Sequence, residues 1–67
     1  MCTGMLLKQF FNERGITASA VAESLGISRS GLYKKLEGKT DFTMTEARKI
    51  MEFARMNNEE IVRIFFS

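Results

Sequence analysis

Residues 16–43 read ITASAVAESLGISRSGLYKKLEGKTDFT, and this stretch decides the fold. Two short runs of helix-forming residues lie on either side of Gly26. Glycine readily adopts the positive φ that a tight turn between two helices demands, and Ala22 is small enough for a second helix to approach closely. Two helices joined by a turn of about three or four residues, often with a glycine, form a helix-turn-helix. The sequence therefore predicts a helix-turn-helix over residues of about 17–37.

Turn signals divide the whole chain into five short helices. Glycines at 15, 26 and 38 stand where helices are expected to end. Thr43 and Glu46 form a Thr-x-x-Glu capping box that opens the fourth helix. With 67 residues, 45% of them apolar, and no proline, the chain is expected to fold as one compact all-α domain over residues 1–67. The expected helices run from about 5 to 14, from about 18 to 25, from about 29 to 36, onwards from Thr43, and onwards from a cap at Asn58.

Several classes of site are disfavoured by composition. Cys2 is the only cysteine and there is no histidine, so neither a disulfide nor a cysteine-based zinc site can form within the chain, and we expect no metal and no cofactor. We also expect no enzyme and no small-molecule substrate, because no paired acid and base and no activated nucleophile can be recognised. The apolar runs are too short to span a membrane, and Lys8 interrupts the N-terminal one, unlike a signal peptide. A cytoplasmic protein is therefore expected.

Basic residues are concentrated between residues 28 and 39. Four cations and Glu37 give this segment a net charge of +3, which leaves −1 for the rest of a chain whose net charge is +2. A basic patch on a nearly neutral body favours an anionic partner on one face. Charge alone equally allows a solvated helix face. The four cations are Arg29, Lys34, Lys35 and Lys39.

The helix expected over residues 29–36 separates apolar from polar side chains. At about 100° per residue, Leu32 and Leu36 point inward together. The N-terminal half of a recognition helix enters the major groove of DNA. There, arginine and lysine donate two hydrogen bonds to guanine, and serine can contact the edge of more than one kind of base. A tyrosine packs against a thymine methyl group or donates its hydroxyl to a phosphate. The side chains expected to contact bases are Arg29, Ser30, Tyr33 and Lys34.

The quoted stretch resembles the Cro/repressor-type helix-turn-helix family, and the resemblance extends from about residue 6 to residue 65. It implies a compact five-helix domain that binds operator sites in double-stranded DNA as a homodimer. Ala18 departs from the family pattern, in which many members carry a glutamine that holds a phosphate, and Lys35 stands at a position that is often apolar. The resemblance depends on Ala22, Gly26, Ile27, Ser28 and Leu32.

Two further sets of residues complete the predicted interfaces. Residues flanking the recognition helix are expected to contact phosphates, although the hydroxyls among them equally serve as helix caps. Apolar residues at the C-terminal end are expected either to close the core or to form a dimer contact, which the family often makes through its last helix. The phosphate set is Thr17, Ser19, Ser28, Lys35, Lys39 and Thr40, and the dimer set is Val62, Phe65 and Phe66.

The sequence thus favours a sequence-specific DNA-binding regulator of transcription, repressor-like and of the phage or prophage type. A protein–protein module on the same fold, such as an antirepressor or an antitoxin-like partner, is the alternative, because a fold does not determine a function. Two features keep this alternative open: Ala18 stands where many family members carry glutamine, and the acid Glu37 is expected to be exposed.

Overall fold

Five helices follow one another along the part of the chain that the computed structural model describes, residues 3–66. They are α1 (Thr3–Arg14), α2 (Ala18–Leu25), α3 (Arg29–Leu36), α4 (Met44–Phe53) and α5 (Asn58–Phe65). The all-α prediction is therefore confirmed over these residues. Cys2, for which we expected no disulfide or zinc role, lies outside them.

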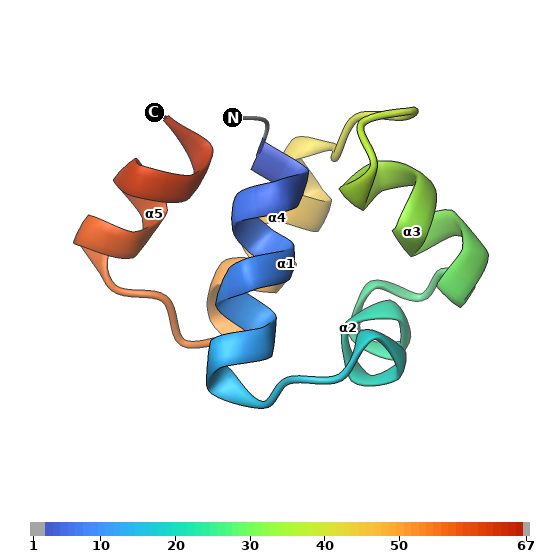
Figure 1. Cartoon of the computed structure of the whole chain (residues 1–67), viewed down its shortest axis with the longest axis horizontal. Helices are drawn as coiled ribbons and strands as arrows, with labels where there is room; N and C mark the ends of the chain where they lie inside the picture. The colour runs from blue at the N-terminus through green and yellow to red at the C-terminus, as the bar shows by residue number, and fades with distance from the viewer. Residues whose placement is uncertain (1–2, 67) are drawn as a thin grey trace.

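The arrangement is centred on α1. In Figure 1, α1 runs through the middle of the molecule, with α5 on one side, α3 on the other, α4 behind it and α2 below α3. Every helix contributes buried apolar side chains to one core, and Phe42 in the α3–α4 loop packs against it. The core consists of Leu7, Phe10, Phe11, Val21, Ala22, Leu25, Leu32, Leu36, Ile50, Ala54, Met56 and Ile64.

Side-chain caps fix where the helices begin. The Thr43–Glu46 capping box predicted for α4 is present, with both reciprocal hydrogen bonds formed. The expected cap of the last helix at Asn58 is wrong, because Asn57 takes that place and Asn58 is the first helical residue. Glu60, three residues after Asn57, completes a second capping box, whereas the residue three after Asn58 is the apolar Ile61. The first helix also begins two residues earlier than expected, at Thr3.

The turn between α2 and α3 has the geometry that the sequence predicted. Gly26 has φ 70° and its N–H donates to the carbonyl of Glu23 at 3.1 Å. The next N–H, of Ile27, donates to the carbonyl of Ala22 at 3.1 Å. Because a side chain is rarely tolerated at this φ, glycine at 26 allows α2 to end and α3 to begin within three residues. Together, α2 and α3 form a helix-turn-helix.

A close approach of two backbones joins α1 to the end of α3. A Cβ atom placed on Gly4 would lie 2.0 Å from the carbonyl oxygen of Leu36 and 2.8 Å from its Cα. No real Cβ atom tolerates such distances, so only glycine at position 4 lets α1 pass this carbonyl. The position of α3 is therefore set partly by a residue far from it in sequence.

An ion pair links α1 to α5. The Arg14 guanidinium pairs with the Glu60 carboxylate and also lies 4.7 Å from the centre of the Phe10 ring. The backbone N–H of Asn57, and then Arg14, hold the pKa of Glu60 below its ordinary value of 4.5.

None of the helices within residues 3–66 is long and apolar enough to cross a bilayer.

Candidate functional site

The outer face of α3 carries the four side chains that we predicted to contact bases. Arg29, Ser30 and Lys34 are exposed, and Tyr33 is 40% exposed. On the opposite side of the same helix, two leucines are buried in the core. The helical period turns Ser30, Tyr33 and Lys34 away from these leucines and puts Arg29 on the flank, at the start of the helix. We call these four exposed side chains the α3 face.

The hydroxyls at the start of α2 and α3 are helix caps. Thr17 Oγ1 accepts a hydrogen bond from the Ala20 N–H at 3.1 Å, and Ser28 Oγ accepts one from the Gly31 N–H at 3.0 Å. A hydroxyl that accepts still has its own hydrogen to donate, so capping leaves both side chains able to bind a further acceptor. Ser19 is exposed in the first turn of α2.

Lys39 and Thr40 follow α3 and are exposed. The Lys39 ammonium lies 3.7 Å from the Glu37 carboxylate, and the two side chains are 68% and 58% exposed. An ion pair this open to water contributes little, on the order of 0–1 kcal/mol. Lys39 therefore remains available to another anion beside the α3 face.

Lys35 is placed differently from the other basic residues of this segment. Its side chain is only 15% exposed, and its Nζ lies 3.0 Å from Oε1 of Glu46. The same ammonium donates to the backbone carbonyl of Asp41 at 3.0 Å and lies 5.9 Å from the centre of the Phe42 ring. Lys35 thus ties α3 to α4 and to the loop between them, and it does not share the outward surface.

The carboxylate that receives Lys35 is also the capping residue of α4. The Thr43 N–H donates to Glu46 Oε1 at 2.8 Å. This backbone hydrogen bond, with the Lys35 ammonium, holds the pKa of Glu46 below its ordinary value of 4.5. Glu46 therefore stays ionised, and keeps its bond to Lys35, at pH values where an unpaired glutamate is protonated.

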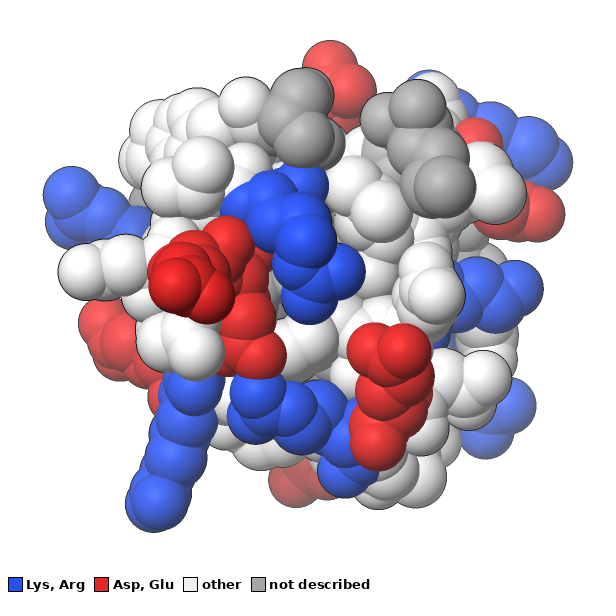
Figure 2. All heavy atoms as spheres, turned by 60° about the vertical axis from the view of Figure 1, so that its left-hand side comes forward, with Lys and Arg blue, Asp and Glu red and all other residues white. Residues whose placement is uncertain are grey.

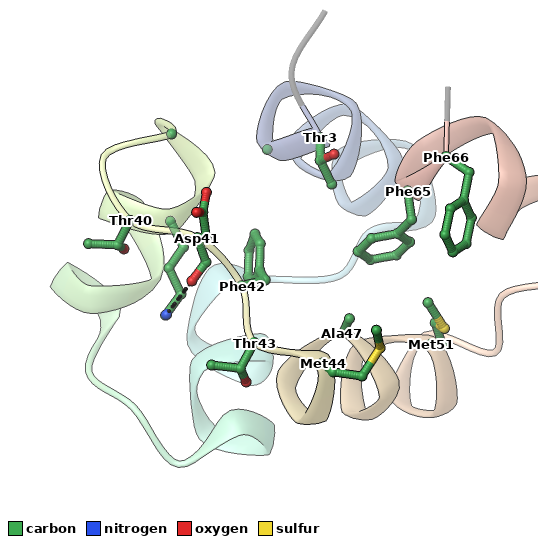
Figure 3. A pocket seen from close by; sticks show the side chains of 13 residues that line it. Thr3, Thr40, Asp41, Phe42, Thr43, Met44, Ala47, Met51, Phe65 and Phe66 are labelled. Atoms are coloured by element: carbon green, nitrogen blue, oxygen red, sulfur yellow. Dashed lines mark hydrogen bonds between the residues drawn. The ribbon is translucent and has the colours of Figure 1, made fainter.

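The residues predicted for a dimer contact lie in α5 and directly after it. Val62 is 58% exposed and Phe66 is 71% exposed, whereas Phe65 is half-buried and packs against the core. Phe65 and Phe66 line a hollow of about 660 Å³ together with Met44 and Met51 of α4. Figure 3 shows the two phenylalanine rings on one wall and the methionine side chains facing them. We call this space the α4–α5 hollow.

Sequence reasoning missed Met44, which is 72% exposed at the first position of α4. The signal was the position of this apolar residue directly after the N-cap Thr43. On the side of the molecule that carries α5, acidic and basic side chains are interspersed around uncharged areas (Figure 2). This side is thus of mixed charge, unlike the basic segment of residues 28–39.

A smaller hollow of about 350 Å³ lies between α1, the turn after it and α3. We call it the α1–α3 hollow. Lys8 and Asn12 of α1 line it, and sequence reasoning assigned neither to an interface. It also reaches Thr17 and Tyr33, which were both predicted to contact DNA.

Among residues 3–66, no cluster of three or more histidine, cysteine, aspartate or glutamate side chains is placed to hold a metal ion.

Comparison with known families gives a match. A family model described as Helix-turn-helix matches residues 7–55, from within α1 to just beyond α4, which is well over half of the chain. Comparison with curated proteins and with solved structures gives no match.

Proposed function

The chain belongs to the Cro/repressor-type helix-turn-helix family, whose members bind double-stranded DNA and regulate transcription, and from this premise we propose that it is a sequence-specific, repressor-like regulator of the phage or prophage type. The observation that carries the proposal is the α3 face. It presents Arg29, Ser30, Tyr33 and Lys34 together while the other side of the helix is buried.

In the proposed complex, α3 lies in the major groove as the recognition helix. Arg29 and Lys34 donate hydrogen bonds to guanine O6 and N7, and Ser30 contacts a neighbouring base edge. Tyr33 packs against a thymine methyl group or donates to a phosphate. These contacts give the protein its sequence preference.

Contacts to phosphates fix the position of the protein on the duplex. We assign them to the hydroxyl and N–H groups at the starts of α2 and α3 and to the residues after α3. We leave Lys35 out of this set, because its ammonium already binds Glu46 and the Asp41 carbonyl. The proposed phosphate contacts are Thr17, Ser19, Ser28, Lys39 and Thr40.

The proposed regulator acts as a homodimer in the cytoplasm. Val62 and Phe66 present exposed apolar surface at the end of the described chain, where Phe65 is half-buried against the core. A two-fold dimer binds two half-sites about 34 Å apart, one turn of the double helix. The operator is therefore expected to be an approximate palindrome.

Selection from a pool of randomised duplexes, followed by sequencing, tests the proposal. We expect an enriched site with two-fold symmetry. Fluorescence anisotropy titrations on that site should show that affinity falls with salt concentration, with a log–log slope set by several phosphate contacts. If the protein binds no duplex in such a pool at low salt, the proposal is wrong.

A protein–protein module is the second candidate. The α4–α5 hollow favours it, because Met44 and Phe66 are both more than two-thirds exposed at its edge and exposed apolar surface marks contact sites. The selection experiment and sedimentation equilibrium together separate the two candidates. If the protein binds no DNA and stays monomeric, the α4–α5 hollow is left for a different protein.

A further inference from the structure

The α1–α3 hollow combines an apolar floor with a polar rim. Phe11 and Leu36 line it and are buried in the core, and we call these two side chains its floor. Around them stand side chains that can donate hydrogen bonds. These rim residues are Lys8, Asn12, Thr17 and Tyr33.

Lys8 and Asn12 present their donors on the same side of α1. They are four residues apart, which places them on one face of a helix, and both are exposed. Lys8 forms no ion pair within residues 3–66. No acidic residue stands three or four positions from it along α1. Within the described part of the chain, the Lys8 ammonium therefore has no carboxylate partner.

The hollow adjoins the surface that we propose to face DNA. Tyr33 belongs both to the α3 face and to the rim of the hollow, and Thr17 at the start of α2 lies on the same rim. Ala18 also lines the hollow but brings no side-chain donor to it. A duplex seated on the α3 face thus passes beside a space where α1, and not α2, supplies the charged side chain.

We propose that the α1–α3 hollow receives a backbone phosphate of the bound duplex, to which Lys8 Nζ and Asn12 Nδ2 donate hydrogen bonds. This inference rests on the proposed DNA binding and extends the interface to α1. It also provides the phosphate contact for which Ala18 has no donor. Because the partner is a phosphate, the contact adds affinity for every sequence and no preference among them.

Lys8→Ala tests the charge. Titrations by fluorescence anisotropy would use the selected duplex and an unrelated duplex, over a series of salt concentrations starting at about 50 mM. We expect Lys8→Ala to weaken binding of both duplexes about three- to tenfold at the lowest salt and to reduce the log–log salt slope by about 0.9, the value for one phosphate contact. The matched control is Lys49→Ala, which removes the same charge from an exposed position on α4 that lines neither hollow.

Asn12→Asp tests the neighbouring donor. A carboxylate at this place repels a phosphate, so we expect at least a tenfold loss of affinity for both duplexes, as a like charge replaces a hydrogen bond. Gln9→Glu is its control, because it adds the same charge to an exposed position on α1 outside the hollow. Far-ultraviolet circular dichroism would establish that all four variants keep the helical content of the wild type.

The outcomes separate this inference from the function on which it rests. If the wild-type protein binds no duplex, both proposals are wrong. If it binds, but Lys8→Ala and Lys49→Ala have the same salt slope and Asn12→Asp binds as Gln9→Glu does, the assignment of the hollow alone is wrong. A loss for the selected duplex only would also overturn it, because a phosphate contact does not depend on sequence.

Discussion

Arg29 and Lys39 are both exposed cations, but their positions predict different effects on DNA binding. Arg29 begins α3 and belongs to the α3 face, whereas Lys39 follows the helix. We expect Arg29→Ala to weaken the selected site by about 1–3 kcal/mol and to relax the preference at one base position. Lys39→Ala should weaken all duplexes alike and reduce the salt slope by about one contact.

Competition titrations with single-base variants of the selected site would measure this difference. The two substitutions serve as controls for each other, since each removes one positive charge. Equal losses on every sequence from both variants would contradict the assignment of Arg29 to a base.

At Gly4, even the addition of one methyl group should destabilise the fold. Alanine normally stabilises a helix relative to glycine, by about 1 kcal/mol. At this position the added methyl group meets the Leu36 carbonyl at 2.0 Å, so α1 and α3 must separate. We expect Gly4→Ala to lower the free energy of unfolding by about 1–3 kcal/mol, which in a domain of this size lowers Tm by several degrees, about 4–8 °C per kcal/mol.

Thermal unfolding followed by circular dichroism would measure the change. Gln9→Ala, at an exposed position of the same helix, should change the free energy of unfolding by no more than about 0.5 kcal/mol. A Gly4→Ala protein as stable as the wild type would mean that the two backbones do not approach as described.

At the level of elements, α3 is held at both ends. The Ser28 cap and the Gly26 turn set where it begins. At its other end, Lys35 binds α4 and the loop, and the Leu36 carbonyl lies against α1. The α3 face is thus positioned by three different segments of the chain.

The bond between α3 and α4 gives stability a specific dependence on pH. The pKa of Glu46 is lower in the folded protein than its ordinary value of 4.5. A carboxyl of this kind stabilises the fold above its unfolded pKa, and the contribution is lost as pH falls through the folded pKa. We therefore expect the stability difference between the wild type and Glu46→Gln to be full near pH 7 and to shrink below about pH 4.5.

Urea unfolding at a series of pH values would test this expectation. Glutamine can still complete the capping box, so the variant isolates the charge. Glu52→Gln, at an exposed position of α4 that makes neither the cap nor the ion pair, should follow the wild-type pH profile. A difference at Glu46 that is the same at every pH would contradict the role of its charge.

Elements with a local signal could be predicted from the sequence. The turn at Gly26 and the Thr43 capping box each depend on residues within a few positions of one another, and both are present. The cap of the last helix was wrong by one residue because two asparagines are adjacent and only the position of Glu60 distinguishes them. The inward placement of Lys35 could not be predicted, since it depends on Glu46 in another helix.

Non-local geometry also explains what was missed around the candidate site. The helical period turns Ser30, Tyr33 and Lys34 outward and puts Arg29 on the flank of α3, and the structure exposes all four side chains. Lys8 and Asn12, however, become neighbours of Tyr33 only when α1 packs beside α3. Nothing in the sequence near α1 indicates that contact.

For the whole molecule, association through α5 is the prediction to test. Phe66 is 71% exposed beside the α4–α5 hollow. In a dimer that buries this side chain, glutamate in its place leaves a charge without a partner, which costs several kcal/mol. We expect Phe66→Glu to raise the Kd of dimerisation at least about tenfold, the equivalent of about 1.4 kcal/mol.

Sedimentation equilibrium over a range of protein concentrations would measure Kd. Phe53→Glu is the matched control, because Phe53 is also exposed but lines neither hollow. If both variants associate as the wild type does, or if the wild type stays monomeric when DNA is present, α5 is not the dimer contact.

The backbone contact at Gly4 has a consequence for the DNA and not only for the protein. Because α3 contacts α1 at the Leu36 carbonyl and α4 through Lys35, we expect it to tilt little toward an imperfectly placed groove. In the proposed complex, any misfit between the two half-sites must then be taken up by bending or twisting the double helix between them, at a cost that depends on how flexible those base steps are. Operators that differ only in this central segment, which the protein does not touch, should therefore bind with different affinities. Those with flexible TA or CA steps in the segment should bind most tightly.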